Sequence, residues 1–139
     1  MKDADIKYYQ QKMSIMDNGS IYYLKYCEIN YISYIRPYIH IFTIFDKEIL
    51  INYSLLKFIT NLPDLFFTCN KSTIINIAHL KSLCKNGTFF FVLLENDKKI
   101  KVSRRKVCKI KNLLTKIDGD FLNCEVCILK NKKTGNETL

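Results

Sequence analysis

The chain has 139 residues, the size of a single domain, and 48% of them are apolar, so it can bury a core without help from disulfide crosslinks. Its 22 Lys and Arg residues against 13 Asp and Glu residues give a formal net charge of +9, which favours a polyanionic partner such as nucleic acid or an acidic membrane surface. No uninterrupted apolar run reaches the roughly 18 residues that a bilayer-spanning helix requires, so we expect a soluble protein without a membrane span.

The first 18 residues are polar and show no clear period, so residues 1–19 are predicted to be an N-terminal tail or a fragment of a linker helix. Three segments rich in β-branched and aromatic residues follow, and residues 20–26, 28–34 and 38–45 are each predicted to form a strand. Pro37 cannot donate a hydrogen bond to a neighbouring strand. A turn or a sheet edge is therefore expected at Arg36 and Pro37.

A hairpin turn and a short helix are predicted next. Asp46 and Lys47 indicate a tight turn into a strand over residues 48–52. Ser54 is the expected N-cap of an amphipathic helix, because apolar residues follow it at helical spacing until Pro63 prevents continuation.

The middle of the chain has the pattern of further short strands separated by turns. The predicted strand segments are residues 66–67, 73–77, 79–84, 88–94 and 99–102. Asn86 and Gly87 give a strong signal for a two-residue hairpin turn, and Asn96 and Asp97 mark the next turn. Many short strands with only two short helices indicate an all-β or β-dominated α+β domain. The pattern argues against a helix-turn-helix, so any recognition of DNA by such a domain must use loops, strands or helix ends.

A basic segment at residues 97–116 carries most of the net charge. Nine Lys and Arg residues stand there against one acid, Asp97, so the segment contributes +8 of the +9. Ser103 is the expected N-cap of a second helix, whose end is predicted at Gly119. The apolar stripe of this helix consists of Val107, Ile110, Leu113, Leu114 and Ile117. The domain is therefore placed at residues 20–118, and residues 119–139 form a C-terminal extension in which residues 121–129 have the composition of one more strand.

The first turn of this predicted helix contains Ser103, Arg104, Arg105 and Lys106. The positive end of a helix dipole favours acids, so cations placed there do not serve stability. Backbone N–H groups together with two guanidinium groups suit a phosphate or a guanine. The alternative is that Arg104 and Arg105 belong to a solvated charged helix face.

The sequence offers no residues on which an enzymatic or metal-binding function could rest. The six cysteines are expected to be reduced thiols in the cytoplasm, and the single C-x-x-C pair, Cys124 and Cys127, lacks the second pair that a zinc site needs. His40 and His79 are each predicted to be structural residues within strands. Paired carboxylates, a nucleophile triad and a phosphate-binding glycine loop are all missing from the sequence, so no enzyme activity and no cofactor are expected.

Large apolar residues frame a polar group in the segment FFTCNKSTIINIAHL. Residues 68–72 are therefore expected to form a short polar loop, held at the surface by packing on both sides. Cys69 lies beside the expected binding residues of this loop, where its oxidation could alter binding.

At this segment and at the later segment IKVSRRKVCKI, the sequence resembles the LytTR family of bacterial transcription regulators. The family hallmark is F-x-R-x-H-x-S-x-x-V-N, followed by a strand that ends in S-R-R or S-V-R before the last helix. Residues 67–76, one position shorter than the first motif, and residues 102–105 are matched to these motifs. The resemblance extends from about Ser20 to about Ile117. It implies a mainly β fold, an elongated sandwich of small β-sheets with two short α-helices, that reads DNA through loops in successive major grooves.

The resemblance implies DNA contacts at three places. These are the turn with Arg36, Tyr38, Ile39 and His40, the loop with Asn70 and Lys71, and Arg105 at the helix start. Their neighbours Ser72, Ser103 and Arg104 are also expected to contact DNA. The match at the first turn leaves the choice between Ile39 and His40 open. Phosphate attraction is expected from Lys98, Lys99, Lys101, Lys106 and Lys109. Lys71 replaces the His or Asn of the family and lacks the bidentate amide geometry that suits adenine, so Asn70 is expected to supply it.

The sequence thus predicts sequence-specific binding of double-stranded DNA at promoter direct repeats, by two copies per site, in a bacterial cytoplasm. The family usually carries a receiver domain ahead of this module, and none fits before Ser20. We therefore expect either an excised domain or a free-standing regulator controlled by its abundance or by a regulatory protein partner. The alternative is a protein-interaction or single-stranded nucleic-acid-binding β module, since an exposed face rich in Tyr and Phe suits bases or a partner strand. A membrane-surface role of the basic helix is a third interpretation.

Overall fold

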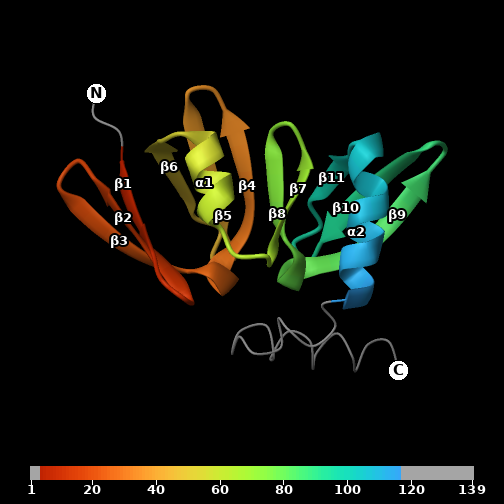
Figure 1. Ribbon diagram of the computed structural model, residues 1–139, viewed down its shortest axis with the longest axis horizontal. Helices are drawn as coiled ribbons and strands as arrows, with labels where there is room; N and C mark the ends of the chain where they lie inside the picture. The colour runs from red at the N-terminus through yellow and green to blue at the C-terminus, as the bar shows by residue number, and fades with distance from the viewer. Residues whose placement is uncertain (1–3, 117–139) are drawn as a thin grey trace.

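The computed structural model describes residues 4–116, which form eleven strands and two α-helices. The strands make three antiparallel sheets that succeed one another along the long axis of the molecule (Figure 1). The predicted fold class, mainly β with an elongated arrangement of small sheets and two short helices, is confirmed.

The first sheet consists of β1 (Asp5–Tyr8), β2 (Lys12–Asp17) and β3 (Ser20–Lys25), in that order. The prediction of a tail or linker helix over the first 18 residues is therefore wrong for β1 and β2. Met13 and Ile15 are fully buried and Ile6 is nearly so, because each short strand turns alternate residues toward the core. Asn18 and Gly19 both have a positive φ, of 50° and 82°, which identifies a tight hairpin turn that the sequence analysis missed.

The central sheet has five strands in the order β6-β5-β4-β8-β7. In chain order they are β4 (Ile29–Ile35), β5 (Tyr38–Thr43), β6 (Glu48–Asn52), β7 (Phe66–Asn70) and β8 (Thr73–Asn76). The strands predicted here are confirmed to within a few residues, and Asp46 has the positive φ (60°) of a tight turn. One face of the sheet packs against the first sheet in a first core, which includes Ile32, Ile39, Ile41 and Ile51.

Helix α1 (Leu55–Asn61) also packs into the first core. The Ser54 side chain accepts a hydrogen bond from the Lys57 backbone N–H at 3.3 Å, as an N-cap does, and the helix ends before Pro63. Phe58 is fully buried. The predicted cap and amphipathic character are therefore confirmed.

The third sheet consists of β9 (Leu80–Asn86), β10 (Phe89–Leu94) and β11 (Lys99–Val102), in the order β11-β10-β9. Helix α2 (Arg104–Lys116) packs with this sheet and with the other face of the central sheet in a second core. Ile110 is fully buried, and Val107, Leu113 and Leu114 pack against the core, which confirms that part of the predicted stripe. The remaining predictions for the C-terminal part, at Ile117, Gly119, residues 121–129, Cys124 and Cys127, lie outside the described residues.

Buried polar side chains fix the junction between the central and third sheets. Asn76 Nδ2 donates hydrogen bonds to the carbonyl oxygens of Tyr26 and Ile29 at 3.1 and 2.9 Å. His79 is fully buried, and its Nε2 lies 2.6 Å from the Cys27 carbonyl oxygen. This histidine lies in the 3-10 turn η2 (Ile77–His79), so its predicted place in a strand is wrong. These contacts of Asn76 and of His79 Nε2 hold the connection to the third sheet against the segment of residues 26–29.

Candidate nucleic-acid interface

Three segments that are distant in sequence lie along one long edge of the molecule. They are the β4–β5 turn, the β7–β8 turn and the start of α2, all at the upper edge in Figure 1. We call residues 35–38, 70–72 and 103–106 the loop edge. The first two turns meet because β4 and β8 are antiparallel neighbours, so the end of one strand lies beside the beginning of the other.

Backbone hydrogen bonds join the three segments. The Tyr34 N–H donates to the Ser72 carbonyl oxygen at 2.7 Å, which links the first turn to the second. The Ser103 N–H donates to the Cys69 carbonyl oxygen at 2.9 Å, which links the second turn to the residue before α2. The relative positions of the three segments are therefore set by hydrogen bonds between strands.

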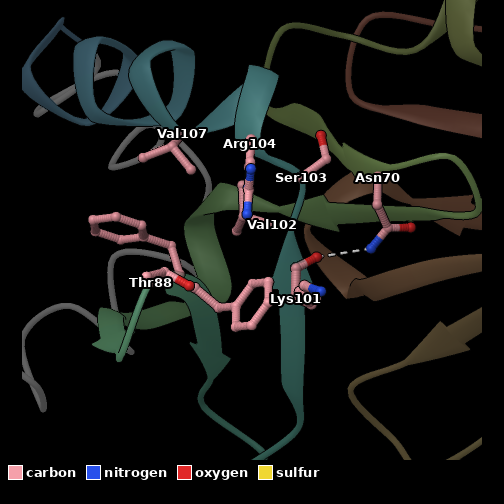
Figure 2. Close-up of a pocket in the computed structure, with 9 residues that line it drawn as sticks. Asn70, Thr88, Lys101, Val102, Ser103, Arg104 and Val107 are labelled. Atoms are coloured by element: carbon pink, nitrogen blue, oxygen red, sulfur yellow. Dashed lines mark hydrogen bonds between the residues drawn. The ribbon is translucent and has the colours of Figure 1, made fainter.

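The second turn is shorter than predicted. Because β7 extends through Asn70, the expected five-residue polar loop is reduced to Lys71 and Ser72, and both are exposed. Asn70 Oδ1 accepts hydrogen bonds from the Ser72 backbone N–H at 3.0 Å and from its hydroxyl at 3.3 Å, while Asn70 Nδ2 donates to the Lys101 carbonyl oxygen at 2.8 Å (Figure 2). The amide that was expected to contact adenine thus holds the turn against β11, and Lys71 is the exposed cation of this turn.

Cys69 is buried beside the second turn. Its side chain has no exposed area, and burial raises the pKa of the thiol to about 12, with the Lys106 ammonium opposing that rise. Such a thiol is almost entirely protonated at neutral pH and is inaccessible to reagents. Burial therefore removes the basis for the hypothesis that oxidation of Cys69 alters binding.

The start of α2 presents cations without acids. Arg104 and Arg105 are exposed, Lys106 is half-buried, and the first turn contains no Asp or Glu. The Lys106 N–H donates to the Ser103 carbonyl oxygen at 2.9 Å, so Ser103 directly precedes the first helical turn, as predicted. The first N–H groups of a helix lack partners within the helix. An anion placed there would satisfy them and the two guanidinium groups together.

A hollow of about 390 Å³ adjoins the loop edge (Figure 2). Its lining combines apolar side chains with two cations and consists of Asn70, Thr88, Phe89, Phe90, Lys101, Val102, Ser103, Arg104 and Val107. Lys101 Nζ lies 3.8 Å from the centroid of the Phe89 ring, so its charge is held beside the start of α2. Lys109 is exposed farther along the helix. Positive charge thus continues from the loop edge onto β11 and α2.

The first turn presents some of the predicted residues and buries one. Arg36 is exposed at the tip and Tyr38 is half-buried. Ile39 has no exposed area and belongs to the first core, so its prediction as a DNA contact is wrong, because alternation along β5 turns it inward. His40 faces the other way, but its Nδ1 contacts the Glu48 carboxylate. A neighbouring acid disfavours phosphate, so Arg36 is the better placed cation of this turn.

Two exposed apolar side chains near this edge were not singled out from the sequence. Ile35 is 59% exposed at the end of β4, and Phe89 is 40% exposed at the beginning of β10. Phe89 begins a continuous run of apolar residues, and Ile35 ends a strand rich in Ile and Tyr, so composition alone does not separate them from their core-facing neighbours. Their exposure depends on where the packed sheets end.

The described residues contain no competing candidate site of two common kinds. Within residues 4–116, no group of three or more His, Cys, Asp or Glu side chains is placed to hold a metal ion. Both α1 and α2, the helices of the described chain, are too short or too polar to cross a bilayer. The exposed cations of the loop edge and the adjoining hollow make up the candidate functional site of this part of the chain.

Comparison with known proteins gives one family and one fold. The family model for the LytTr DNA-binding domain matches residues 19–115. Among solved structures, the chain is similar to the LytTr DNA-binding domain of a Bacillus cereus protein described as a methyl-accepting/DNA response regulator, with a TM-score of 0.64 and 19% identity, over 76% of this chain and 98% of that chain. Comparison with curated proteins gives no match.

Replacing Asn70 tests whether its amide holds the second turn. Asn70→Ala removes the acceptor for Ser72 and the donor to Lys101, and Asn70→Asp removes the donor alone. Each change should lower the free energy of unfolding, measured by urea denaturation without DNA, by about 1 to 2 kcal/mol. Lys71→Ala is the matched control in the same turn and should change it by less than about 0.5 kcal/mol. Unchanged stability in both Asn70 variants would rule out the positioning role.

The burial of Cys69 predicts a difference in thiol reactivity. In the folded protein at pH 8, iodoacetamide should modify the exposed Cys108 and leave Cys69 unmodified, as measured by mass spectrometry of peptides. Raising the pH to 9 should not change this, because a thiol of pKa about 12 is still only about one part in a thousand thiolate there. Unfolding in urea should make Cys69 reactive. Modification of both cysteines at similar rates in the folded protein would contradict the burial.

Proposed function

Because this chain belongs to the LytTR family, whose members are DNA-binding domains of transcription regulators, we propose that residues 19–115 bind double-stranded DNA sequence-specifically and thereby regulate transcription. The observation that carries this proposal is the loop edge, where three segments distant in sequence present exposed cations on one side of the molecule. Each segment contributes at least one exposed cation: Arg36 in the first, Lys71 in the second and Arg105 in the third. A single edge can face one side of a duplex, with its segments entering neighbouring stretches of the major groove.

In this proposal Lys71 and Arg105 contact the base edges. The planar guanidinium of Arg105 suits bidentate hydrogen bonds to O6 and N7 of guanine. The Lys71 ammonium can donate to guanine or to phosphate, but it has no acceptor for the amino group of adenine. Asn70 contributes by positioning Lys71, because Ser72 and Lys101 already engage its amide.

Phosphate contacts surround these two residues. Arg104, Lys106 and Ser103 stand at the positive end of the α2 dipole, and Lys101 and Lys109 extend the positive surface onto β11 and the next turns of the helix. Such contacts fix the orientation of a protein on DNA but carry no direct sequence information. Binding should therefore be strongly salt-dependent.

On promoter DNA we propose that two copies bind, one on each of two direct repeats, in a bacterial cytoplasm. Control of this binding by a regulatory protein partner is part of the same proposal. Selection of duplexes from a random library by the purified protein tests the proposal. Enrichment of a defined sequence supports it, and retention of all sequences alike would contradict specific binding.

Single-stranded nucleic acid is the second candidate ligand, because the outward face of the third sheet carries Phe89 and Phe91. Lys101 Nζ lies 3.8 Å from the centroid of the Phe89 ring, and Lys99 Nζ lies 4.6 Å from that of Phe91. These ammonium groups occupy ring faces on which bases would have to stack. Duplex DNA is therefore favoured. Competition between duplex and single-stranded oligonucleotides of one sequence separates the two candidates.

Arg105→Ala tests the assignment of base reading. It should weaken binding to the selected duplex by about 1 to 3 kcal/mol and relax the preference at one base pair, while binding to random duplexes changes much less. Fluorescence anisotropy titrations with both duplexes measure the difference. Lys7→Ala is the control, because Lys7 is an exposed residue of β1, in the sheet that contributes nothing to the loop edge. Equal losses on both duplexes would remove Arg105 from base reading.

Lys109→Ala tests the assignment of phosphate contacts. It should weaken binding to all duplexes alike, and the slope of log K against log salt should become shallower by about 0.9 if the side chain neutralises one phosphate. Anisotropy titrations at several salt concentrations give the slope. A slope identical to that of the unmodified protein would show that Lys109 does not touch the DNA backbone.

A further inference from the structure

We propose that Ile35 reads the methyl group of a thymine in the major groove beside the first turn, so that the preferred duplex has a thymine at that position. This inference rests on the proposed function and specifies the DNA that the loop edge selects. Ile35 is the single large apolar side chain that is exposed within residues 35–38, 70–72 and 103–106, and 59% of its area is open.

The exposure of Ile35 follows from the extent of the second core. Tyr31, Ser33 and Ile35 project from the same face of β4, since side chains alternate along a strand. Tyr31 is only 9% exposed because it packs in the second core, Ser33 is half-buried, and Ile35 is open. The cover over this face therefore ends before β4 reaches the loop edge.

The neighbours of Ile35 hold it where a duplex would lie. Strand β4 pairs with β5 up to its last residue, Ile35, which lies opposite Tyr38. The turn between the two strands therefore has only Arg36 and Pro37. The β-branched side chain has few rotamers, so fixing it against a ligand costs little conformational entropy. Arg36, which is exposed next to it, can contact the phosphate backbone on the same side.

Thymine is the base that this chemistry selects. Its C5-methyl group is the apolar feature of the major-groove base edges, and apolar side chains pair with it by contact rather than by hydrogen bonding. Lys71 and Arg105 offer only donors and favour guanine or phosphate. Ile35 therefore adds selection of an A·T pair that the cationic residues of the loop edge cannot provide.

Replacement of thymine by deoxyuridine tests this inference, because it removes the methyl group and leaves base pairing intact. Each thymine of a duplex selected by the full chain is replaced in turn, and dissociation constants are measured for the unmodified protein, Ile35→Ala and Leu56→Ala. Leu56 is the matched control, a large aliphatic residue that is 72% exposed on α1. One replacement should weaken binding of the unmodified protein and of Leu56→Ala about three- to tenfold.

The same replacement should change the affinity of Ile35→Ala by less than about twofold, because the partner of the methyl group is already gone. If specific duplexes are selected but no deoxyuridine replacement matters, or if one matters equally in Ile35→Ala, the thymine assignment is wrong while the proposed function stands. If no specific duplex is selected, the proposed function itself fails. The loss of affinity on removal of one methyl group is measured on the unmodified protein as well, so that part of the test does not depend on the stability of a variant.

Discussion

Hydrogen bonds between neighbouring strands are the constraint on which the candidate site depends. The Tyr34 N–H bond to Ser72 ties the first turn to the second, and the Ser103 N–H bond to Cys69 ties the second turn to the start of α2. The Asn70 amide adds a side-chain bond across the same gap. Without these bonds, cations separated by more than 60 positions in the sequence would not share one edge. The geometry of the interface is thus a property of the scaffold, and the exposed side chains supply its chemistry.

Several residues of the loop edge are in positions that do not favour the stability of the fold. The loop edge has cations at the positive end of a helix dipole, an exposed isoleucine, and an exposed lysine on a two-residue turn. These placements do not favour stability. Two apolar cores on either side of the central sheet offset such costs. Phe58 and Ile110, which α1 and α2 contribute to them, are both fully buried. A ligand with negative charge would attract these cations, and an apolar group on it would cover the exposed isoleucine. Duplex DNA that contains thymine has both features.

Local signals in the sequence predicted most of the fold. Ser54 before an apolar stripe predicted the start of α1, and the Asn86–Gly87 signal predicted a hairpin whose two-residue turn lies one residue later, at Gly87 and Thr88. Both signals are local, because caps and tight turns depend on neighbouring residues. The strands β1 and β2 were missed, although Asn18–Gly19 carried the same hairpin signal, because their polar composition concealed a short alternation. Side-chain direction was harder to predict. Ile39 and Cys69 proved to be buried, and the Asn70 amide proved to be hydrogen-bonded within the protein. A shift of one residue along a strand moves each side chain to the other face, so such directions are easily mistaken.

The most direct test of the account is a nuclear magnetic resonance titration of the isotope-labelled full chain with a duplex selected for binding. The largest amide shifts should fall in residues 35–38, 70–72 and 103–106, with smaller changes at Lys101 and Lys109 and little change in the first sheet. Shifts concentrated in the first sheet or on the outward face of the third sheet, with the loop edge unchanged, would contradict the claim that these three segments form one DNA-binding surface.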